Sequence, residues 1–251
     1  MYPLHPFNPL TEKSSVFHVK HIESQLSQDQ ILRFQKVCSS FPMDPADKIE
    51  LSEKAFERFQ TYLNQILDWN KRIHLVSKGD ARPERILRHF VDSLTIFKAV
   101  QIPSGANLLD LGAGPGLPSI PIKIVRDDLS LSLVESIRKK SLFLQKLVND
   151  LKLEDVSVIN KRAEDLIDVP DYKENFNVVT AKALGKLKDT VELAISFLKP
   201  KGLLIAYKGE RVEEEIKECC EEKNFLIKKK IIVKVPDFDL KRTIVVIEKV
   251  G

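Results

Sequence analysis

Apolar and polar positions follow different patterns in two parts of the chain. Up to about residue 102, apolar residues recur every three or four positions, which is the period of an amphipathic helix. After the turn-forming triplet Pro103-Ser104-Gly105, short apolar runs of strand length alternate with segments of helical length. Strands that alternate with helices predict a doubly wound sheet of mostly parallel strands. We therefore expect an α/β fold with an N-terminal helical cap.

Three helices are expected in the first part. Ser27 and Gln30 have the spacing of a capping box ahead of a short helix. Asp47 and Glu50 repeat this spacing ahead of a second helix, which ends near Asp68. A third helix turns one apolar face inward, formed by Ile86, Leu87, Phe90, Val91, Leu94 and Phe97.

The elements of the second part follow from the alternation. Strands are expected at Asn107–Leu111, Leu131–Val134, Val156–Ile159, Phe176–Thr180 and Gly202–Tyr207, with helices at Arg138–Leu151, Asp189–Leu198 and Glu210–Lys223. The last two strands, Phe225–Val235 and Arg242–Val250, have only a short loop between them, so they should form an antiparallel hairpin. The expected sheet has five parallel strands and an antiparallel pair at its C-terminal edge.

These patterns divide the chain into three units. Residues 1–26 have no period and are expected to be an extended or poorly ordered arm. Residues 27–102 form the all-α cap, in which residues 69–80 are a polar link between helices. Residues 103–251 form the α/β domain.

A glycine-rich turn follows the first strand of the α/β domain. Its residues Gly112, Gly114 and Gly116 come directly after a carboxylate, Asp110, in the order D-x-G-x-G-x-G. Glycines let the backbone take positive φ and approach a ligand closely. A dinucleotide fingerprint would need a third glycine where Leu117 stands, and a P-loop would need a G-K-[S/T] triplet. An acidic residue before such a turn suits a ligand with a cationic amino-acid tail, and S-adenosylmethionine fits that description.

A second carboxylate supports an adenosine cofactor. Glu135 stands at the end of the second strand of the α/β domain. In doubly wound folds, an acidic residue at this place binds the ribose hydroxyls.

Composition and charge add limits. No apolar run approaches 18 residues, and the N-terminus lacks the basic and apolar regions of a secretory signal, so no membrane partner is expected. Three cysteines, two of them adjacent, do not make a disulfide framework, which favours a cytoplasmic protein. A net charge of +4 permits an anionic partner. No metal site is expected.

Several motifs of the chain occur together in one known family. They are W-N-K-x-x-x-L at 69–75, R-H-F-V-D-S-L at 88–94, D-L-G-A-G-P-G-L-P-S-I-P at 110–121, E-S-I-R-K-K-S-L-F-L at 135–144, R-A-E at 162–164, Y-K-G at 207–209 and R-T-I-V-V-I at 242–247. With them, the chain resembles the RsmG (GidB) family of bacterial enzymes. These enzymes use S-adenosylmethionine to methylate N7 of a guanine in 16S, small-subunit ribosomal RNA. The resemblance covers about residues 69–249, and the first 45 residues have no counterpart in it.

The resemblance implies a Rossmann-like methyltransferase sheet and a set of cofactor contacts. The residues assigned to the cofactor are Gly112, Gly114, Leu117, Glu135, Ser136, Ala163, Glu164 and Lys182. Two positions depart from the family pattern. The family usually has S-R-A where this chain has Ala181-Lys182-Ala183, and lysine does not replace a bidentate arginine. It usually has Asp at the place of Glu135.

The chemistry of guanine N7 requires few catalytic groups. N7 is an unprotonated lone pair and the sulfonium methyl is already activated, so the protein's task is in-line placement of the reacting atoms. The chain lacks the [D/N/S]-P-P-[Y/F/W] box of exocyclic-amine methyltransferases, and none of its cysteines lies near the site. No residue is assigned as acid, base or nucleophile. His89 and Asp92 could form a charge pair near the methyl or support the glycine loop.

Basic residues near the C-terminal ends of the strands are candidates for contact with RNA, because open α/β sheets bind ligands at that edge. Lys182, Lys208 and Arg242 are predicted to position the substrate, and further candidates are Lys186, Lys188 and Arg211. The expected partner is 16S ribosomal RNA or a small-subunit assembly particle, and the protein is expected to act as a monomer. The alternatives are a methyltransferase of a small molecule or protein, and a non-catalytic RNA-binding module that retains S-adenosylmethionine. A nicotinamide oxidoreductase is disfavoured by Leu117.

Overall fold

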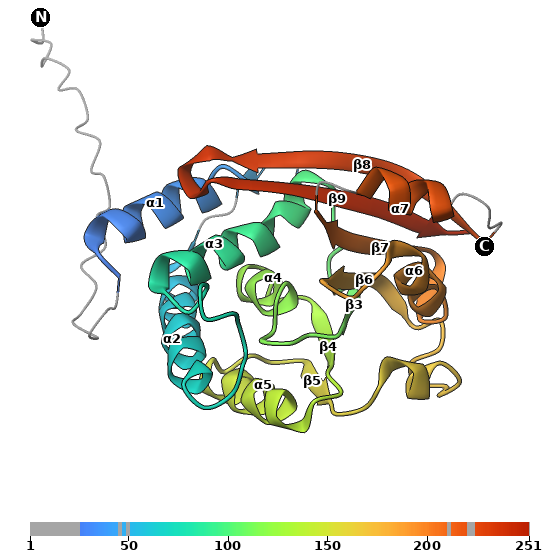
Figure 1. The fold of residues 1–251 in the computed structure, drawn as a ribbon, viewed down its shortest axis with the longest axis horizontal. Coiled ribbons are helices and arrows are strands. Elements are labelled where there is room, and N and C mark those ends of the chain that lie inside the picture. Colours follow the sequence, from blue (N-terminus) through green and yellow to red (C-terminus); the bar gives the residue numbers. More distant parts are fainter. Residues whose placement is uncertain (1–25, 45–46, 49–50, 210–211, 220–223, 251) are drawn as a thin grey trace, which may run out of the picture.

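A seven-stranded sheet forms the centre of the molecule (Figure 1). The computed structural model describes residues 26–44, 47–48, 51–209, 212–219 and 224–250. The strands are β3 (Asn107–Leu111), β4 (Ser130–Val134), β5 (Val156–Ile159), β6 (Phe176–Lys182), β7 (Leu198–Lys208), β8 (Phe225–Val235) and β9 (Leu240–Lys249). Their order in the sheet is β5-β4-β3-β6-β7-β9-β8. β3 to β7 pair in parallel, and β9 is antiparallel to both β7 and β8, so the predicted sheet and its C-terminal hairpin are confirmed.

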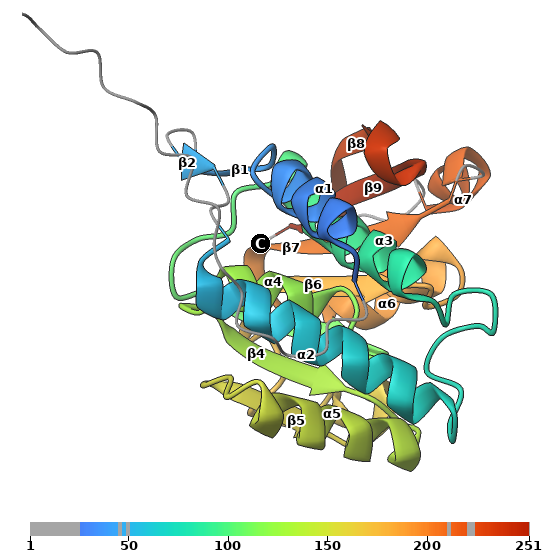
Figure 2. The same cartoon turned by 90° about the vertical axis from the view of Figure 1, so that its left-hand side faces the viewer.

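Helices cover both faces of the sheet (Figures 1 and 2). The helices are α1 (Gln28–Cys38), α2 (Glu53–Asn70), α3 (Pro83–Leu94), α4 (Ser119–Val125), α5 (Arg138–Asp150), α6 (Leu187–Ile195) and α7 (Val212–Cys219). Short 3-10 helices are η1 (Thr95–Lys98), η2 (Ala163–Leu166) and η3 (Pro236–Phe238). One apolar cluster joins α1 to α5 with one face of the sheet, and a second joins α6 and α7 with the other face.

The sequence pattern predicted an all-α N-terminal part, and this prediction is wrong. A short antiparallel pair, β1 (Pro42–Asp44) with β2 (Asp47–Lys48), lies between α1 and α2. The capping box at the start of α1 is confirmed, because the Ser27 and Gln30 side chains each accept the other's backbone N–H, at 3.2 and 2.8 Å.

The start and end of α2 differ from the prediction. Asp47 lies in β2, and Glu50 lies outside the described residues, so the predicted cap there is wrong. Ser52 caps the helix instead, since its Oγ accepts the Ala55 N–H at 3.1 Å. The helix continues to Asn70, because Trp69 packs edge-on against Phe143 of α5 at 5.6 Å and is not part of a polar link.

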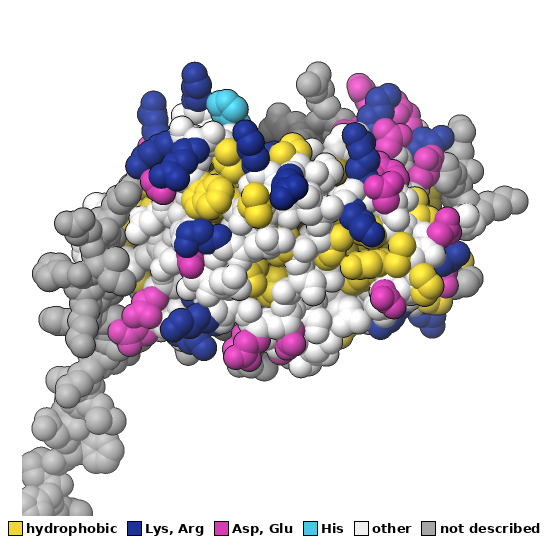
Figure 3. Space-filling model, turned by 90° about the horizontal axis from the view of Figure 1, so that it is seen from below, with side chains coloured by type: hydrophobic (Ala, Val, Ile, Leu, Met, Phe, Trp, Pro, Cys, Tyr) yellow, Lys and Arg dark blue, Asp and Glu magenta, His cyan; other side chains and the backbone are white. Residues whose placement is uncertain are grey.

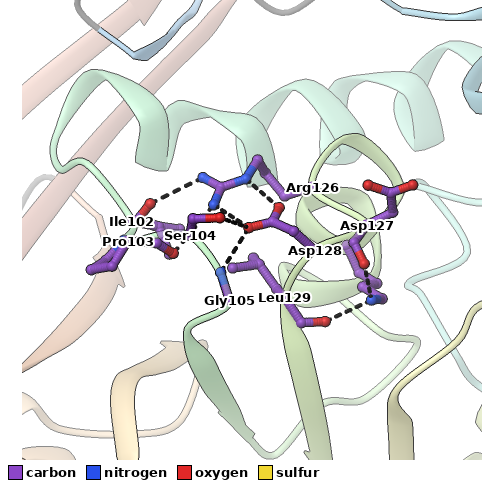
Figure 4. Close-up of polar contacts among 9 residues, drawn as sticks. Ile102, Pro103, Ser104, Gly105, Arg126, Asp127, Asp128 and Leu129 are labelled. Carbon is purple, nitrogen blue, oxygen red and sulfur yellow. Dashed lines mark hydrogen bonds and ion pairs between the residues drawn. The ribbon is translucent and has the colours of Figure 1, made fainter.

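The segment that enters β3 is held by one ion pair (Figure 4). The Asp128 carboxylate accepts hydrogen bonds from Arg126, from the Gly105 N–H at 2.9 Å and from the Ser104 hydroxyl at 3.3 Å. Arg126 also donates to the Ile102 carbonyl at 3.0 Å. The hydrogen bond from Arg126 holds the pKa of Asp128 well below its usual range. The turn at residues 103–105 is therefore fixed to the loop between α4 and β4.

Two negative findings apply to the part of the chain that the structure describes. Within it, no helix combines the length and apolarity needed to cross a membrane. Within the same ranges, no group of three or more His, Cys, Asp or Glu side chains is arranged to hold a metal ion.

Candidate functional site

The glycine loop at the end of β3 is anchored by a helix from the N-terminal part. Gly112, Gly114 and Gly116 all have positive φ, at 68°, 56° and 94°. The Tyr62 hydroxyl of α2 donates to the Pro115 carbonyl at 2.6 Å. A Cβ added at Gly116 would lie 2.9 Å from that hydroxyl, so only glycine fits between the loop and α2. Packing from α2 thus fixes the shape of the loop.

The glycines of the loop differ in exposure, since Gly112 is exposed and Gly114 is buried. A Cβ added at Gly114 would meet only the Gly112 carbonyl, at 3.9 Å, so the buried backbone there has free space beside it. At Gly112 an added Cβ would lie 2.8 Å from Leu184 Cδ1 of the loop after β6. Leu117 is buried and packs into the core beneath the loop. The loop therefore has a packed side and an open side.

Glu135 lies beside the open side of the loop, at the end of β4. Its carboxylate accepts the Gly114 N–H at 2.9 Å on Oε2 and the Ile137 N–H at 2.7 Å on Oε1. Each oxygen keeps one further lone pair for a ligand. The Asn160 amide holds this turn in place through the carbonyls of Glu135 and Ser136, at 2.8 and 3.1 Å. The Ser136 side chain itself is exposed.

The segment after β5 borders the same region. Ala163 and Glu164 begin η2, and Glu164 lines a cavity of about 390 Å³ together with Leu184 and Thr190. Because Leu184 also faces Gly112, this cavity lies next to the glycine loop. The structure thus brings the predicted cofactor residues of β3, β4 and η2 to one edge of the sheet.

A buried carboxylate beneath the loop has an unusual environment. Asp110 is fully buried, and its Oδ1 accepts the Thr180 hydroxyl at 3.1 Å, while Thr180 also contacts the Ser119 hydroxyl at 2.8 Å. Among the described residues, the other oxygen, Oδ2, has no hydrogen-bond partner. Burial raises the pKa of Asp110 to about 7.

Asp92 on α3 joins two cations from distant parts of the chain. Its carboxylate is only 1% exposed and lies 2.7 Å from Lys182 Nζ at the end of β6. Arg242 of β9 donates to both oxygens of Asp92, at 2.7 and 2.8 Å. Burial alone would raise the pKa of Asp92, but the charges of Lys182 and Arg242 hold it below its ordinary value. Burial lowers the pKa of Lys182, and Asp92 opposes that shift.

The three predicted substrate-positioning cations line one cavity of about 420 Å³. Two of them, Lys182 and Arg242, also pair with Asp92. The Arg242 guanidinium further donates to the Lys208 carbonyl at 3.2 Å. The Lys208 ammonium donates to the Gly185 carbonyl and to Glu215, both at 2.7 Å. Lys208 is therefore tied to the loop after β6, and its free hydrogen-bonding capacity is reduced.

His89 does not pair with Asp92, although both are on α3. Its Nε2 lies 3.7 Å from Asp80, and it lines the cavity of the three cations. Burial lowers the pKa of His89, and the charge of Lys182 lowers it further, against the effect of Asp80. The imidazole is therefore neutral at physiological pH.

The other predicted cations have separate surroundings. Lys186 precedes α6 as its N-cap residue, and Lys188 lies 3.8 Å from Glu192. Arg211 lies outside the described residues. Sequence reasoning missed the central place of Asp92 and the anchoring role of Tyr62. The signal for Asp92 was a carboxylate within an otherwise apolar, inward-facing stretch of α3.

Most of the chain matches one family of known proteins. Residues 55–245 match the family model described as rRNA small subunit methyltransferase G. The protein named ribosomal RNA small subunit methyltransferase G from Clostridium botulinum (strain Loch Maree) is 36% identical over 205 residues, covering 80% of this chain and 85% of that protein. The protein of that name from Desulfitobacterium hafniense is 39% identical over 170 residues, or 68% and 70% of the two chains. The crystal structure of a predicted O-methyltransferase from Agrobacterium tumefaciens shares the fold, with a TM-score of 0.51, 18% identity and coverage of 65% and 81%.

Proposed function

Because the chain belongs to the rRNA small subunit methyltransferase G family, we propose that it transfers a methyl group from S-adenosylmethionine to N7 of a guanine in 16S ribosomal RNA. The observation that carries the proposal is the position of the open glycine loop next to a cation-lined cavity. Leu184 borders both, since it lies beside Gly112 and lines the cavity of Lys182 and Arg242. A methyl donor and an RNA nucleotide can therefore be held side by side.

The residues around the loop fit the cofactor. The backbone at Gly112 is exposed, there is free space beside Gly114, and the free lone pairs of Glu135 can accept ribose hydroxyls. Ala163 and Glu164 stand where the adenine is expected, next to the cavity below Leu184. When bound, S-adenosylmethionine supplies a methyl group on a sulfonium, which needs no further activation.

The cations would hold the substrate. Asp92 fixes the positions of Lys182 and Arg242, so these side chains lose little freedom when they contact a phosphate or the guanine edge. Arg242 uses three N–H groups within the protein and keeps others for a ligand. Lys208 acts mainly by fixing the loop that carries Leu184 and Gly185.

Transfer to N7 needs no general base, because no proton leaves the nucleophile. His89 is the titratable group of the cavity whose ordinary pKa lies closest to neutral pH. We expect that the logarithm of the single-turnover rate, plotted against pH, has no limb of slope one that disappears in the His89→Ala variant. Such a limb, with a pKa below the ordinary histidine value, would give His89 a chemical role.

The test of the function is direct. Labelled S-adenosylmethionine is incubated with the protein and with 16S ribosomal RNA that lacks the modification, both naked and in small subunits, and the labelled base is mapped. We expect the label on N7 of one guanine. Glu135→Gln should lower cofactor affinity, measured by calorimetry, without unfolding the protein. Label on no RNA, or on a small molecule or protein instead, would contradict the proposal.

The proposal includes a cytoplasmic monomer. Cys38 is a free, buried thiol, which agrees with a reducing compartment. Sedimentation of the purified protein tests the monomer, and cell fractionation tests the compartment.

A further inference from the structure

A cavity separate from the glycine loop lies between α1, α3 and the turn that joins β8 to β9. It has a volume of about 380 Å³. Four arginines line it, Arg33 from α1 and Arg82, Arg85 and Arg88 from the start of α3, and the turn at residues 236–239 forms the opposite wall. Figures 1 and 2 both show α1, α3 and the β8–β9 hairpin side by side. We name this cavity the arginine pocket.

The arginines are not fully used within the protein. The Arg88 Nη2 donates to the Asp239 carbonyl at 2.8 Å, but its Nε is buried and has no hydrogen-bond partner among the described residues. A buried N–H without an acceptor is costly, so this atom indicates a ligand with oxygen acceptors. Among the residues that the structure describes, Arg33 pairs only with the exposed Asp29, at 3.0 Å, and such surface pairs are weak.

Arg82 and Arg85 point to the same conclusion. Both are exposed, and within the described ranges neither guanidinium makes a hydrogen bond or an ion pair closer than 4 Å. Three carboxylates, Glu84, Asp237 and Asp239, also line the pocket, so it does not attract anions by net charge alone. The affinity of the pocket for phosphate therefore has to come from the planar, forked geometry of guanidinium groups, which suits phosphate oxygens.

Helix α3 connects the arginine pocket to the catalytic cavity, which is the cavity lined by Lys182, Lys208 and Arg242. Arg85, His89 and Asp92 are spaced three or four residues apart, so they follow one face of the helix. His89 lines the cavity of Lys182 and Arg242, and the rise of the helix from Arg85 to Asp92 is about 10 Å. An RNA strand whose guanine enters the catalytic cavity can therefore place a neighbouring phosphate in the arginine pocket.

We propose that the arginine pocket binds a backbone phosphate of the ribosomal RNA substrate next to the target guanine; this rests on the proposed function. The pocket also gives α1 a role. α1 precedes the residues 55–245 that match the family, and it is fixed on the core by its buried side chains, such as Phe34, which packs on Phe59 at 5.1 Å. α1 places Arg33 opposite α3 and so completes one wall of the site.

The test compares two double variants that each remove two positive charges. Arg82→Gln with Arg85→Gln changes the pocket, and Lys54→Gln with Lys201→Gln is the matched control. Lys54 and Lys201 are exposed, and they lie near the starts of α2 and β7, away from the carboxyl ends of the strands. Binding of naked, unmodified 16S ribosomal RNA and of assembled small subunits is measured against salt concentration, together with cofactor affinity, KM for RNA and kcat.

The pocket variant should bind RNA roughly tenfold more weakly than the control, and its salt slope should fall by roughly 0.7–0.9 for one lost phosphate contact. KM for RNA should rise, while kcat and cofactor affinity stay close to wild type. The change to lysine at both positions keeps the charges and should restore most of the salt slope. Arg33→Gln should weaken RNA binding in the same direction.

Three results would overturn the proposal. The pocket variant could match the control in affinity and salt slope. It could lose transfer activity with unchanged RNA binding. It could also lose affinity only for assembled small subunits, in which case the pocket contacts a ribosomal protein. Methylation of 16S ribosomal RNA by the wild-type protein is scored separately, so the proposed function can stand even if the pocket assignment fails.

Discussion

At the scale of single residues, the site depends on one buried carboxylate. Asp92 pairs with both Lys182 and Arg242, which approach it from strands 90 and 150 residues further along the chain. Such a buried group is not a strong source of net stability, because its desolvation offsets most of the attraction. Its removal is a different matter, since it leaves Lys182 without its carboxylate partner and Arg242 with only the Lys208 carbonyl.

Asp92→Ala should therefore lower the free energy of unfolding by about 3–5 kcal/mol at pH 7.5. The folded-state pKa of Asp92 is below its unfolded value, so its contribution is present above the unfolded pKa and is lost as pH falls through the folded one. The difference between variant and wild type should accordingly shrink toward pH 3, as measured by urea unfolding. Asp168→Ala, at a side chain that is 93% exposed, is the control and should change little. An equal loss at both pH values would mean that charge is not the cause.

Asp110 should show the opposite pH dependence. Its pKa is raised to about 7 by burial, so the folded state retains a proton that the unfolded state has released. Stability is then lost as pH rises from the ordinary carboxyl value through about 7. Asp110→Asn should be more stable than wild type at pH 8 by roughly 2–4 kcal/mol, and this gain should nearly vanish at pH 4.5. Destabilisation of similar size at both pH values would show that the carboxylate is well solvated or paired.

Some of the site could be predicted residue by residue, and some could not. The glycine loop and Glu135 could be placed because strand ends carry them to one edge of the sheet. The meeting of Lys182, Lys208 and Arg242 follows from the same rule. The partners of Asp92 could not be predicted from the sequence. Proximity along the chain suggested His89, whereas Lys182 and Arg242 come close to Asp92 only in the folded sheet.

At the scale of secondary-structure elements, α2 supports a site to which it contributes no cofactor residue. Tyr62 stacks on Phe90 of α3 at 4.7 Å and donates its hydroxyl hydrogen to the Pro115 carbonyl of the glycine loop. The sequence pattern predicted the helix but not this hydrogen bond. Phenylalanine and tyrosine fit the same apolar period, so periodicity gives no information about the hydroxyl.

Tyr62→Phe should cost about 1 kcal/mol of unfolding free energy, because it leaves the partly buried Pro115 carbonyl without its donor. The loop should also become less well fixed, so cofactor affinity should fall several-fold. Tyr172→Phe is the matched control, since the Tyr172 hydroxyl makes no hydrogen bond to a described residue. Calorimetric titration and thermal unfolding of both variants measure the effects. If the two variants showed the same stability and the same cofactor affinity, α2 would not anchor the glycine loop.

Errors in the predicted elements had a local cause. The pair Asp47 and Glu50 was predicted to start α2, but the structure starts the helix after Ser52. The chain before Ser52 instead forms β1 and β2, which are too short to produce a recognisable period. Long, strongly periodic segments such as α3 and the β8–β9 hairpin were predicted closely.

At the scale of the whole molecule, basic side chains are spread over the surface, often next to acidic ones. Figure 3 shows Lys and Arg interspersed with Asp and Glu on one face, with a basic group at one end of it. Many lysines are paired, such as Lys228 with Glu248 and Lys230 with Glu213. Net charge therefore says little about where RNA binds, and the argument has to rest on particular cations such as those of the arginine pocket.

The division of the chain at residue 103 remains a prediction, and the packing gives reason to expect a single folding unit. One apolar cluster runs from α1, α2 and α3 into β3, β4 and α5. Polar contacts cross the same boundary, because the Tyr207 hydroxyl donates to the Ser93 carbonyl at 2.5 Å and Arg242 pairs with Asp92. Removing the N-terminal helices would expose one face of the sheet and leave buried cations unpaired.

We therefore expect a fragment of residues 103–251 to lack a cooperative unfolding transition and to bind no S-adenosylmethionine, because its sheet would have an uncovered apolar face and no partner for Lys182 and Arg242. A fragment of residues 26–251 keeps every contact of α1 to α3 that the structure describes, and it should unfold like the full chain. Circular dichroism during heating and calorimetric titration distinguish the two. A cooperative transition with cofactor binding in the shorter fragment would show that residues 103–251 are an independent domain, and that the N-terminal helices serve only the substrate.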